Sequence, residues 1–339
     1  MSTLKIEVVE ILDIKPHSNA DRLELVKVKG WYSIVSKGKY QVGDPIIYIP
    51  VDSILPLELS DRLNVTKYLS KGRVRAAKIR GVVSYGLIME NEENWEVGTD
   101  LTKHYNITKF EPPTRIEAGE STKRHPLLIT YTDIENIKNF PTLFQDDEEI
   151  IATEKIHGTN CLHGIVINDD DSEEFIASSH RVQRKEDPKS TYWRTFDEKT
   201  KNLLRKAVQG HRSAFLYKEV YGSKIQHLNY GLTDTISDIA FDLAVDGHYL
   251  DYDDFKELCD EYKISTVPVL YRGTFDRERL DDLVNNKQTK TTLGQASHIM
   301  EGIVIKPTKE RWSEKTGHRV ILKWISDAYA LDKKATDFH

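Results

Sequence analysis

Apolar and polar residues alternate in five short segments within the first 90 residues of the chain. The alternation has a period of two, and glycine-containing turns separate the segments. This pattern is typical of short β-strands joined by tight turns. The predicted strands cover residues 6–11, 23–28, 32–35, 46–49 and 84–89. Five short strands in one small region indicate a small barrel.

Strand and helix patterns interleave from residue 148 to residue 326. We expect strands at 149–154 and 214–219, and helices at 196–209 and 252–262. A further short helix is expected to begin at Thr132, because threonine can cap a helix and Glu135 follows three positions later. The patterns in this half of the chain predict an α+β domain whose sheet is mainly antiparallel.

Residues 91–145 differ from both flanking regions because they are polar and mixed and show no sustained period. The expected division is therefore a barrel domain over 1–100, a linker and domain entry over 101–145, and a second domain over 146–339. In fold class, this is an all-β domain followed by an α+β domain.

Composition restricts where the protein works and what it binds. The 339 residues carry a net charge of −6, so any site for a polyanion must be a local patch. Cys161 and Cys259 are the only cysteines, too few for a disulfide framework or a four-ligand zinc site. No apolar stretch is long enough to cross a bilayer, and the first residues do not resemble a signal peptide. We expect a cytoplasmic protein, with the nucleus as the alternative compartment, and no membrane partner.

Two local clusters of basic residues stand out against the negative total. The first lies within residues 67–80, which contain no acid, and the second is His180–Lys185. The members of the first cluster that we expect to bind nucleic acid are Lys71, Arg73, Arg75, Lys78 and Arg80. Each cluster taken alone is equally well explained as a solvated surface.

The barrel region carries two short motifs, HSNADRL at residues 17–23 and AKIRGV at 77–82. Together they resemble the tRNA-binding OB domains that are appended to aminoacyl-tRNA synthetases. The resemblance covers about the first 90 residues and implies an OB fold whose open face takes single strands. An OB-like barrel that serves only as a packing partner is the alternative.

Near the start of the second domain, Lys155 lies in the motif EKIHGTN, residues 154–160. A lysine is a poor nucleophile at neutral pH because its unperturbed pKa is about 10.4. A cationic neighbour and a divalent metal ion would favour the neutral amine of Lys155 and neutralise a phosphate under attack. Gly158 would let the backbone approach that phosphate closely. A motif this short can also be an ordinary turn.

Four hydrophobic strand patterns, each with one or two polar groups, follow this lysine. In order they are YKEVYG at 217–222, IAFDL at 239–243, MEGIVIKP at 300–307 and VILKW at 320–324. This set, in this order, resembles the covalent nucleotidyltransferase superfamily of RNA ligases, DNA ligases and mRNA capping enzymes. The likeness extends over about 180 residues and implies an ATP-grasp-like ligase domain.

The resemblance also implies roles for individual residues. Lys155 would bind AMP covalently, and His157 and Lys323 would be further catalytic residues. Nucleotide contacts are expected from Glu154, Asn160, Arg181, Glu219, Phe241, Lys306 and Lys323. Glu301 would hold Mg²⁺ or Mn²⁺, a role that suits a carboxylate oxygen. Asp242 would be a second, outer ligand or the anchor of a turn, and Arg181 would also contact the RNA terminus or be an ordinary surface arginine.

Two features favour RNA as the substrate. His157 stands where DNA ligases and capping enzymes usually carry aspartate, and the OB-like region precedes the transferase domain. Both features are similar to RNA ligases, and the domain order matches the Deinococcus and Naegleria group. The resemblance thus implies an ATP-dependent RNA ligase, expected as a monomer, that joins a 3′-hydroxyl to a 5′-phosphate at RNA ends or nicks. A capping-type guanylyltransferase and a non-catalytic OB-fold RNA-binding protein are the alternatives.

Overall fold

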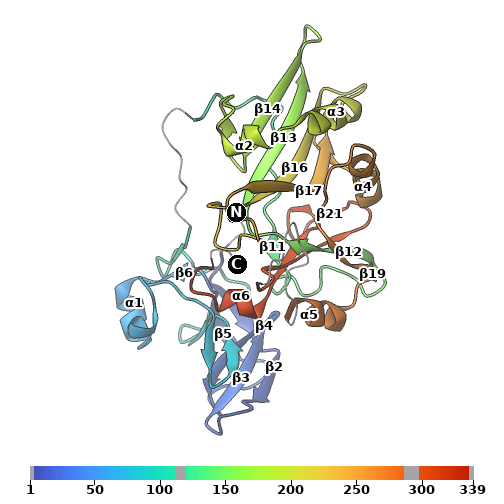
Figure 1. Cartoon of the computed structure of the whole chain (residues 1–339). Coiled ribbons are helices and arrows are strands. Elements are labelled where there is room, and N and C mark those ends of the chain that lie inside the picture. The colour runs from blue at the N-terminus through green and yellow to red at the C-terminus, as the bar shows by residue number, and fades with distance from the viewer. Residues whose placement is uncertain (1–3, 112–119, 286–297, 336–339) are drawn as a thin grey trace. The chain divides into compact units, whose positions relative to one another are not determined.

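The computed structural model describes residues 4–111, 120–285 and 298–335, which belong to two compact units (Figure 1). The first unit is Met1–Pro113, Asp133–Phe144 and Leu322–His339, and the second is Thr114–Thr132 and Gln145–Ile321. Part of the expected linker, 112–119, lies outside the described residues. The compact units differ from the expected domain boundaries chiefly at 322–339, which belong to the unit that contains the barrel.

The first unit consists mainly of short strands. Its elements are β1 (Glu7–Glu10), β2 (Asp13–Pro16), β3 (Leu23–Val28), β4 (Trp31–Ser36), β5 (Pro45–Ile49), β6 (Ser53–Ile54), α1 (Leu57–Arg62), η1 (Thr66–Tyr68), β7 (Ala77–Ile79), β8 (Val82–Ser84), β9 (Leu87–Glu90), β10 (Thr108–Lys109), β11 (Glu135–Asn136), β23 (Leu322–Ile325) and α6 (Asp327–Ala330). Two of its sheets are antiparallel, with the orders β1-β5-β9 and β2-β3-β4.

The five expected strands of this region are present, although the last one is divided. Gly86, between β8 and β9, has a φ of +71°, and a Cβ there would lie 2.5 Å from the Ile49 carbonyl oxygen. Glycine therefore permits a sharp turn against β5 that the alternating pattern alone did not reveal. The side chains of Ile6, Val8 and Ile47 belong to one buried apolar cluster.

The prediction of a short helix that begins at Thr132 is wrong. Glu135 and Asn136 form strand β11, which pairs in parallel with Leu322 and Lys323 of β23. Both residues are buried. This long-range pairing replaces the local capping arrangement, because two buried backbone segments satisfy each other's hydrogen bonds.

The second unit combines a large antiparallel sheet with helices. Its elements are β12 (Glu149–Lys155), β13 (Thr159–Ile167), β14 (Glu173–Ser179), β15 (Gln183–Arg184), α2 (Thr191–Arg194), α3 (Glu198–Ala207), β16 (Ser213–Gly222), β17 (Ile236–Val245), β18 (His248–Tyr249), α4 (Tyr252–Glu261), β19 (Val269–Thr274), α5 (Arg277–Asn285), β20 (Gly302–Pro307), β21 (Trp312–Ser313) and β22 (His318–Arg319). The two expected strands and the two expected helices after residue 148 are present.

Six strands of this unit form one sheet in the order β15-β14-β13-β16-β17-β18. Figure 1 labels four of them, β13, β14, β16 and β17. Residues of α3 and α4, including Leu203, Leu204 and Phe255, belong to one buried cluster with Leu216 and Leu243 of the sheet. The N-terminus of α3 is capped by Asp197, whose carboxylate accepts a hydrogen bond from the Thr200 amide at 2.9 Å. Separately, β12 pairs antiparallel with both β19 and β20.

Among the described residues, no helix combines the length and the apolar character that a bilayer crossing requires.

Candidate active site

Lys155 is the last residue of β12 and is aligned with Gly302 of β20. The strand positions it because Ile150, Ile151 and Ala152 are buried between the neighbouring strands. Its side chain keeps 18% exposure, and its Nζ lies 2.5 Å from Oε1 of the buried Glu301. The strand pairing thus joins a partly accessible amine to a carboxylate 146 residues further along the chain.

The turn after Lys155 is tightly enclosed. A Cβ at Gly158 would lie 2.2 Å from the Val220 carbonyl oxygen and 2.9 Å from Cγ of Glu219. No side chain fits there without moving the backbone of β16. Gly158 therefore brings the lysine turn into direct contact with the strand that carries Glu219.

His157 is buried and uses both ring nitrogens. Its Nδ1 lies 3.0 Å from Oε2 of Glu301, and its Nε2 lies 3.1 Å from Nδ1 of His227. The His157 amide also donates to the Tyr230 hydroxyl at 2.5 Å. Sequence reasoning missed His227 and Tyr230, because they lie in the connection between β16 and β17 and belong to no recognisable motif.

Asn160 and Glu219 are aligned partners on β13 and β16. Aligned residues of antiparallel strands point to the same face of the sheet, so the two polar side chains share one face. Glu154, the neighbour of Lys155, is buried on β12, and its amide donates to the Pro268 carbonyl at 2.9 Å.

Phe241 lies at a β-bulge, where the register between β16 and β17 shifts by one residue. Its half-buried ring packs edge-on against Tyr131 at a centroid distance of 5.1 Å and lies 6.5 Å from the Tyr217 ring. The bulge places both Phe241 and Asp242 beside Tyr217.

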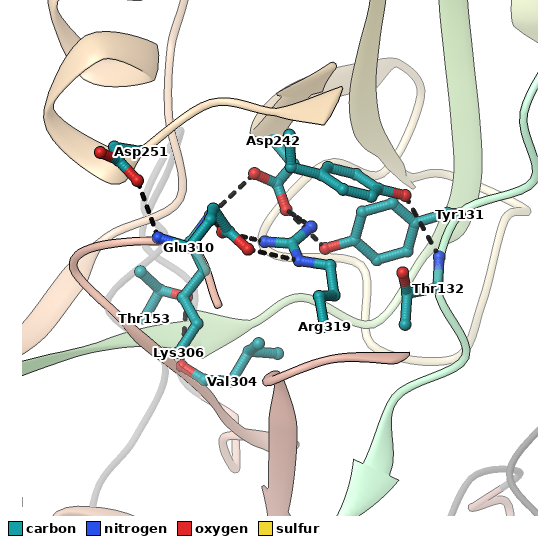
Figure 2. Close-up of polar contacts among 10 residues, drawn as sticks. Tyr131, Thr132, Thr153, Asp242, Asp251, Val304, Lys306, Glu310 and Arg319 are labelled. Carbon is teal, nitrogen blue, oxygen red and sulfur yellow. Dashed lines mark hydrogen bonds and ion pairs between the residues drawn. The ribbon is translucent and has the colours of Figure 1, made fainter. Parts of the chain in front are cut away.

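Figure 2 shows Asp242 between two cations. Lys306 Nζ lies 2.7 Å from Oδ1, Arg319 Nη1 lies 2.6 Å from Oδ2, and the Tyr131 hydroxyl donates to Oδ2 at 2.8 Å. Glu310 binds the other side of Arg319. These contacts hold Asp242 and Lys306 in one buried ion-pair cluster, and their expected contacts with metal and nucleotide stay predictions.

The pKa values within this cluster follow from burial and charge. Burial by itself would raise the pKa of Asp242, but Arg319 and Lys306 outweigh it, and the net pKa is below the ordinary aspartate value. Burial, followed by the charge of Asp242, raises the pKa of Tyr131 well above its usual range. Tyr131 therefore keeps its proton and can donate a hydrogen bond to the Asp242 carboxylate.

Arg181 is exposed in the turn between β14 and β15. The preceding residue, His180, is partly buried, and this burial, with the charge of Arg181, lowers its pKa to about 4. The imidazole is therefore uncharged at neutral pH. Arg181 provides the exposed positive charge of this turn.

The five basic residues expected at the barrel surface fall into two groups. Lys71, Lys78 and Arg80 are exposed. Arg73 is buried, lies 2.7 Å from Asp52 and stacks on the Phe110 ring. Arg75 donates to the main-chain oxygens of residues 332 and 333.

Lys323 is buried on β23 in the first unit, where its carbonyl oxygen accepts a hydrogen bond from the Ile137 amide at 2.9 Å. Its expected contact with the nucleotide stays a prediction.

Glu301 is the carboxylate best suited to a divalent cation. Among the described residues, no group of three or more histidines, cysteines or acids is arranged to hold a metal. Mg²⁺ keeps several waters in most enzymes and is bound through one or two carboxylates together with substrate phosphates. A single buried carboxylate beside Lys155 therefore fits a cation that arrives with a nucleotide.

Comparison with known proteins places this geometry in a family. The RNA ligase family model matches residues 148–325, more than half of the chain. The chain belongs to the RNA ligase family. A separate OB-fold domain model matches residues 5–90 of this RNA ligase. No curated protein matches the chain significantly.

Solved structures of the Naegleria gruberi RNA ligase share the fold of this RNA ligase. A variant of that protein with ATP and manganese is 21% identical, with a TM-score of 0.77 over 96% of this chain and 97% of that chain. The same protein with pyrophosphate is 21% identical, with a TM-score of 0.75 over 96% and 98%. The predicted fold class and the suspected kinship with RNA ligases are confirmed.

Proposed function

We propose that this RNA ligase uses ATP and forms a covalent lysyl-AMP intermediate at Lys155. The observation that carries the proposal is the pair formed by the partly exposed Lys155 amine and the buried Glu301 carboxylate, with His157 on its second oxygen. The Naegleria gruberi RNA ligase, which shares the fold, has been solved with ATP, with AMP and manganese, and with pyrophosphate.

In the first step, the unprotonated Lys155 amine attacks the α-phosphorus of ATP. A nitrogen–phosphorus bond forms, the bond from the α-phosphorus to the bridging oxygen breaks, pyrophosphate leaves, and the nitrogen releases one proton to solvent. Glu301 would hold Mg²⁺ or Mn²⁺, which would neutralise charge on the phosphate oxygens. Glu154, Asn160, Glu219 and Phe241 are proposed to orient the nucleotide, which removes much of the entropic barrier.

The next two steps move AMP to RNA and then release it. An oxygen of the RNA 5′-phosphate attacks the phosphorus on Lys155, so that the nitrogen–phosphorus bond breaks and Lys155 recovers its proton. The RNA 3′-hydroxyl then attacks the activated 5′-phosphate, the phosphodiester forms, and AMP leaves. Lys323 is proposed to contact the α-phosphate, and Arg181 the ribose and the RNA terminus. Lys71, Lys78 and Arg80 are proposed to hold the RNA strand.

We also propose RNA ends or nicked RNA-containing duplexes as substrates, in RNA repair inside the cell. Cys161 and Cys259 are both buried and free, which suits a reducing compartment. A monomer is the simplest working form.

Transfer of radioactive label tests the proposal. The wild type, Lys155→Ala and the exposed-lysine control Lys199→Ala are incubated with α-labelled ATP and a divalent metal, then denatured. We expect label on the wild type and on the control but not on Lys155→Ala. Label taken from GTP instead would support a capping-type enzyme, and RNA binding without any label would support a non-catalytic protein.

A further inference from the structure

The connection between β16 and β17, residues 223–235, contacts the turn that follows Lys155. Two of its residues reach His157 in different ways. Tyr230 accepts a hydrogen bond from the His157 amide, and His227 meets the His157 ring. One connection therefore holds both the main chain and the side chain of the residue that lies two positions after the proposed nucleophile.

Tyr230 is itself firmly held. It is buried, and its ring packs edge-on against Tyr221 at 5.1 Å and against His298 at 4.6 Å. Its φ of +54° lies in the left-handed region, which a tyrosine adopts only when its surroundings fix it. The connection is thus anchored next to His157, and His227, three residues earlier, is anchored with it.

The ring of His157 contacts Glu301 on one side and His227 on the other. Its Nδ1 atom lies 3.0 Å from Oε2 of Glu301, and its Nε2 atom shares a hydrogen bond of 3.1 Å with Nδ1 of the half-buried His227. Which of the two histidines donates in this hydrogen bond depends on their tautomers. In either arrangement, His227 fixes the orientation of the His157 ring.

We propose that His227 is a positioning residue for AMP transfer to Lys155, acting through His157 on the Glu301 carboxylate. This inference rests on the proposed function. Glu301 gives one oxygen to Lys155 and the other to His157, so the carboxylate cannot turn without disturbing both contacts. A His157 ring that is free to rotate or to change tautomer would leave the carboxylate, and with it the Lys155 amine, less well oriented.

Two substitutions separate positioning from packing. His227→Leu removes the hydrogen-bonding group, whereas His227→Asn keeps an amide close to the place of the Nδ1 atom. The matched control is His248→Leu, which changes an exposed histidine on β18. The measurements are the single-turnover rate of lysyl-AMP formation over a range of ATP concentrations, and the melting temperature.

Loss of an outer hydrogen-bond partner typically lowers activity or metal affinity roughly 10- to 100-fold. We expect His227→Leu to lower the maximal rate by about that factor, with little change in the ATP concentration at half-maximal rate. His227→Asn should recover most of the rate, and His248→Leu should match the wild type. A wild-type rate in His227→Leu would overturn the proposal. Equal loss in the Leu and Asn variants, in proportion to a lowered melting temperature, would show packing alone.

A measurement without ATP keeps this proposal separate from the proposed function. Nitrogen NMR of the histidine rings in the full-length wild type reports which nitrogen of His157 is protonated. We expect one tautomer of the His157 ring to predominate in the wild type and a mixture in His227→Leu. The same distribution of tautomers in both proteins would contradict the inference even if the enzyme is active. Absence of AMP transfer in the wild type would contradict the proposed function instead.

Discussion

Two buried carboxylates in the second unit each contact two basic side chains. In one of these two clusters a basic side chain is accessible to solvent, and in the other both are buried. Glu301 contacts Lys155, whose side chain is 18% exposed, and His157. Asp242 contacts Lys306 and Arg319, which are 5% and 7% exposed, and also a buried tyrosine hydroxyl. The difference teaches that a buried ion pair alone does not mark a reactive site. The Glu301 cluster is the open cluster, because its Lys155 amine can contact a substrate, and the Asp242 cluster is the closed cluster.

The closed cluster should matter most for stability. Asp242→Asn leaves Glu310 as the one acid that pairs with Lys306 and Arg319 among the described residues. An uncompensated buried charge typically costs about 3–5 kcal/mol. Urea unfolding should therefore give a free energy of unfolding lower by about that amount. The control, Asp254→Asn on the exposed side of α4, should stay within about 0.5 kcal/mol of the wild type. Equal stability of the two variants would contradict a structural role for Asp242.

The open cluster should matter most for activity. Glu301→Gln keeps the shape of the side chain but removes the charge beside Lys155. Loss of one electrostatic group at a reacting phosphate typically costs about 100- to 1,000-fold in rate. We expect a loss of that size in AMP transfer, with a smaller loss of stability than in Asp242→Asn, because Lys155 can reach water. If the two variants ranked the other way in both assays, the comparison would be reversed.

Acid should lower the contribution that the Asp242 cluster makes to the free energy of unfolding. The folded pKa of Asp242 is below its unfolded value, so its stabilising contribution is complete above the unfolded pKa, near 3.9. It is lost as the pH falls through the folded pKa. Glu310 opposes this trend, because burial raises its pKa. Unfolding free energies between about pH 5 and pH 2 should therefore fall more steeply in the wild type than in Asp242→Asn.

The same distinction between open and closed cations applies to the barrel. Lys78 and Arg80 are exposed, whereas Arg73 is buried against Asp52. Each phosphate contact to a single strand contributes about 0.7 to the slope of log affinity against log salt. The double variant Lys78→Ala, Arg80→Ala should lower that slope by roughly 1.4 in an RNA-binding titration. An unchanged slope would remove both residues from the RNA surface.

The sequence predicted the positions of strands and helices better than it predicted the contacts of individual side chains. Lys155 and Glu301 were both singled out by resemblance, and adjacent strands bring them together. His227 was missed because its contact with His157 depends on a connection without periodicity or motif. The expected roles of Asp242 and Lys306 took no account of Arg319, whose contact with Asp242 is apparent only in the structure. The helix at Thr132 failed because pairing with β23 lies far beyond any local window.

The most direct test of the account is to locate AMP on the protein. After incubation with ATP and a divalent metal, the full-length chain is digested and its peptides are analysed by mass spectrometry under conditions that preserve phosphoramides. We predict that AMP is attached to Lys155 and to no other residue. AMP on another lysine, or complete absence of the adduct in an enzyme that still seals RNA, would contradict the central claim.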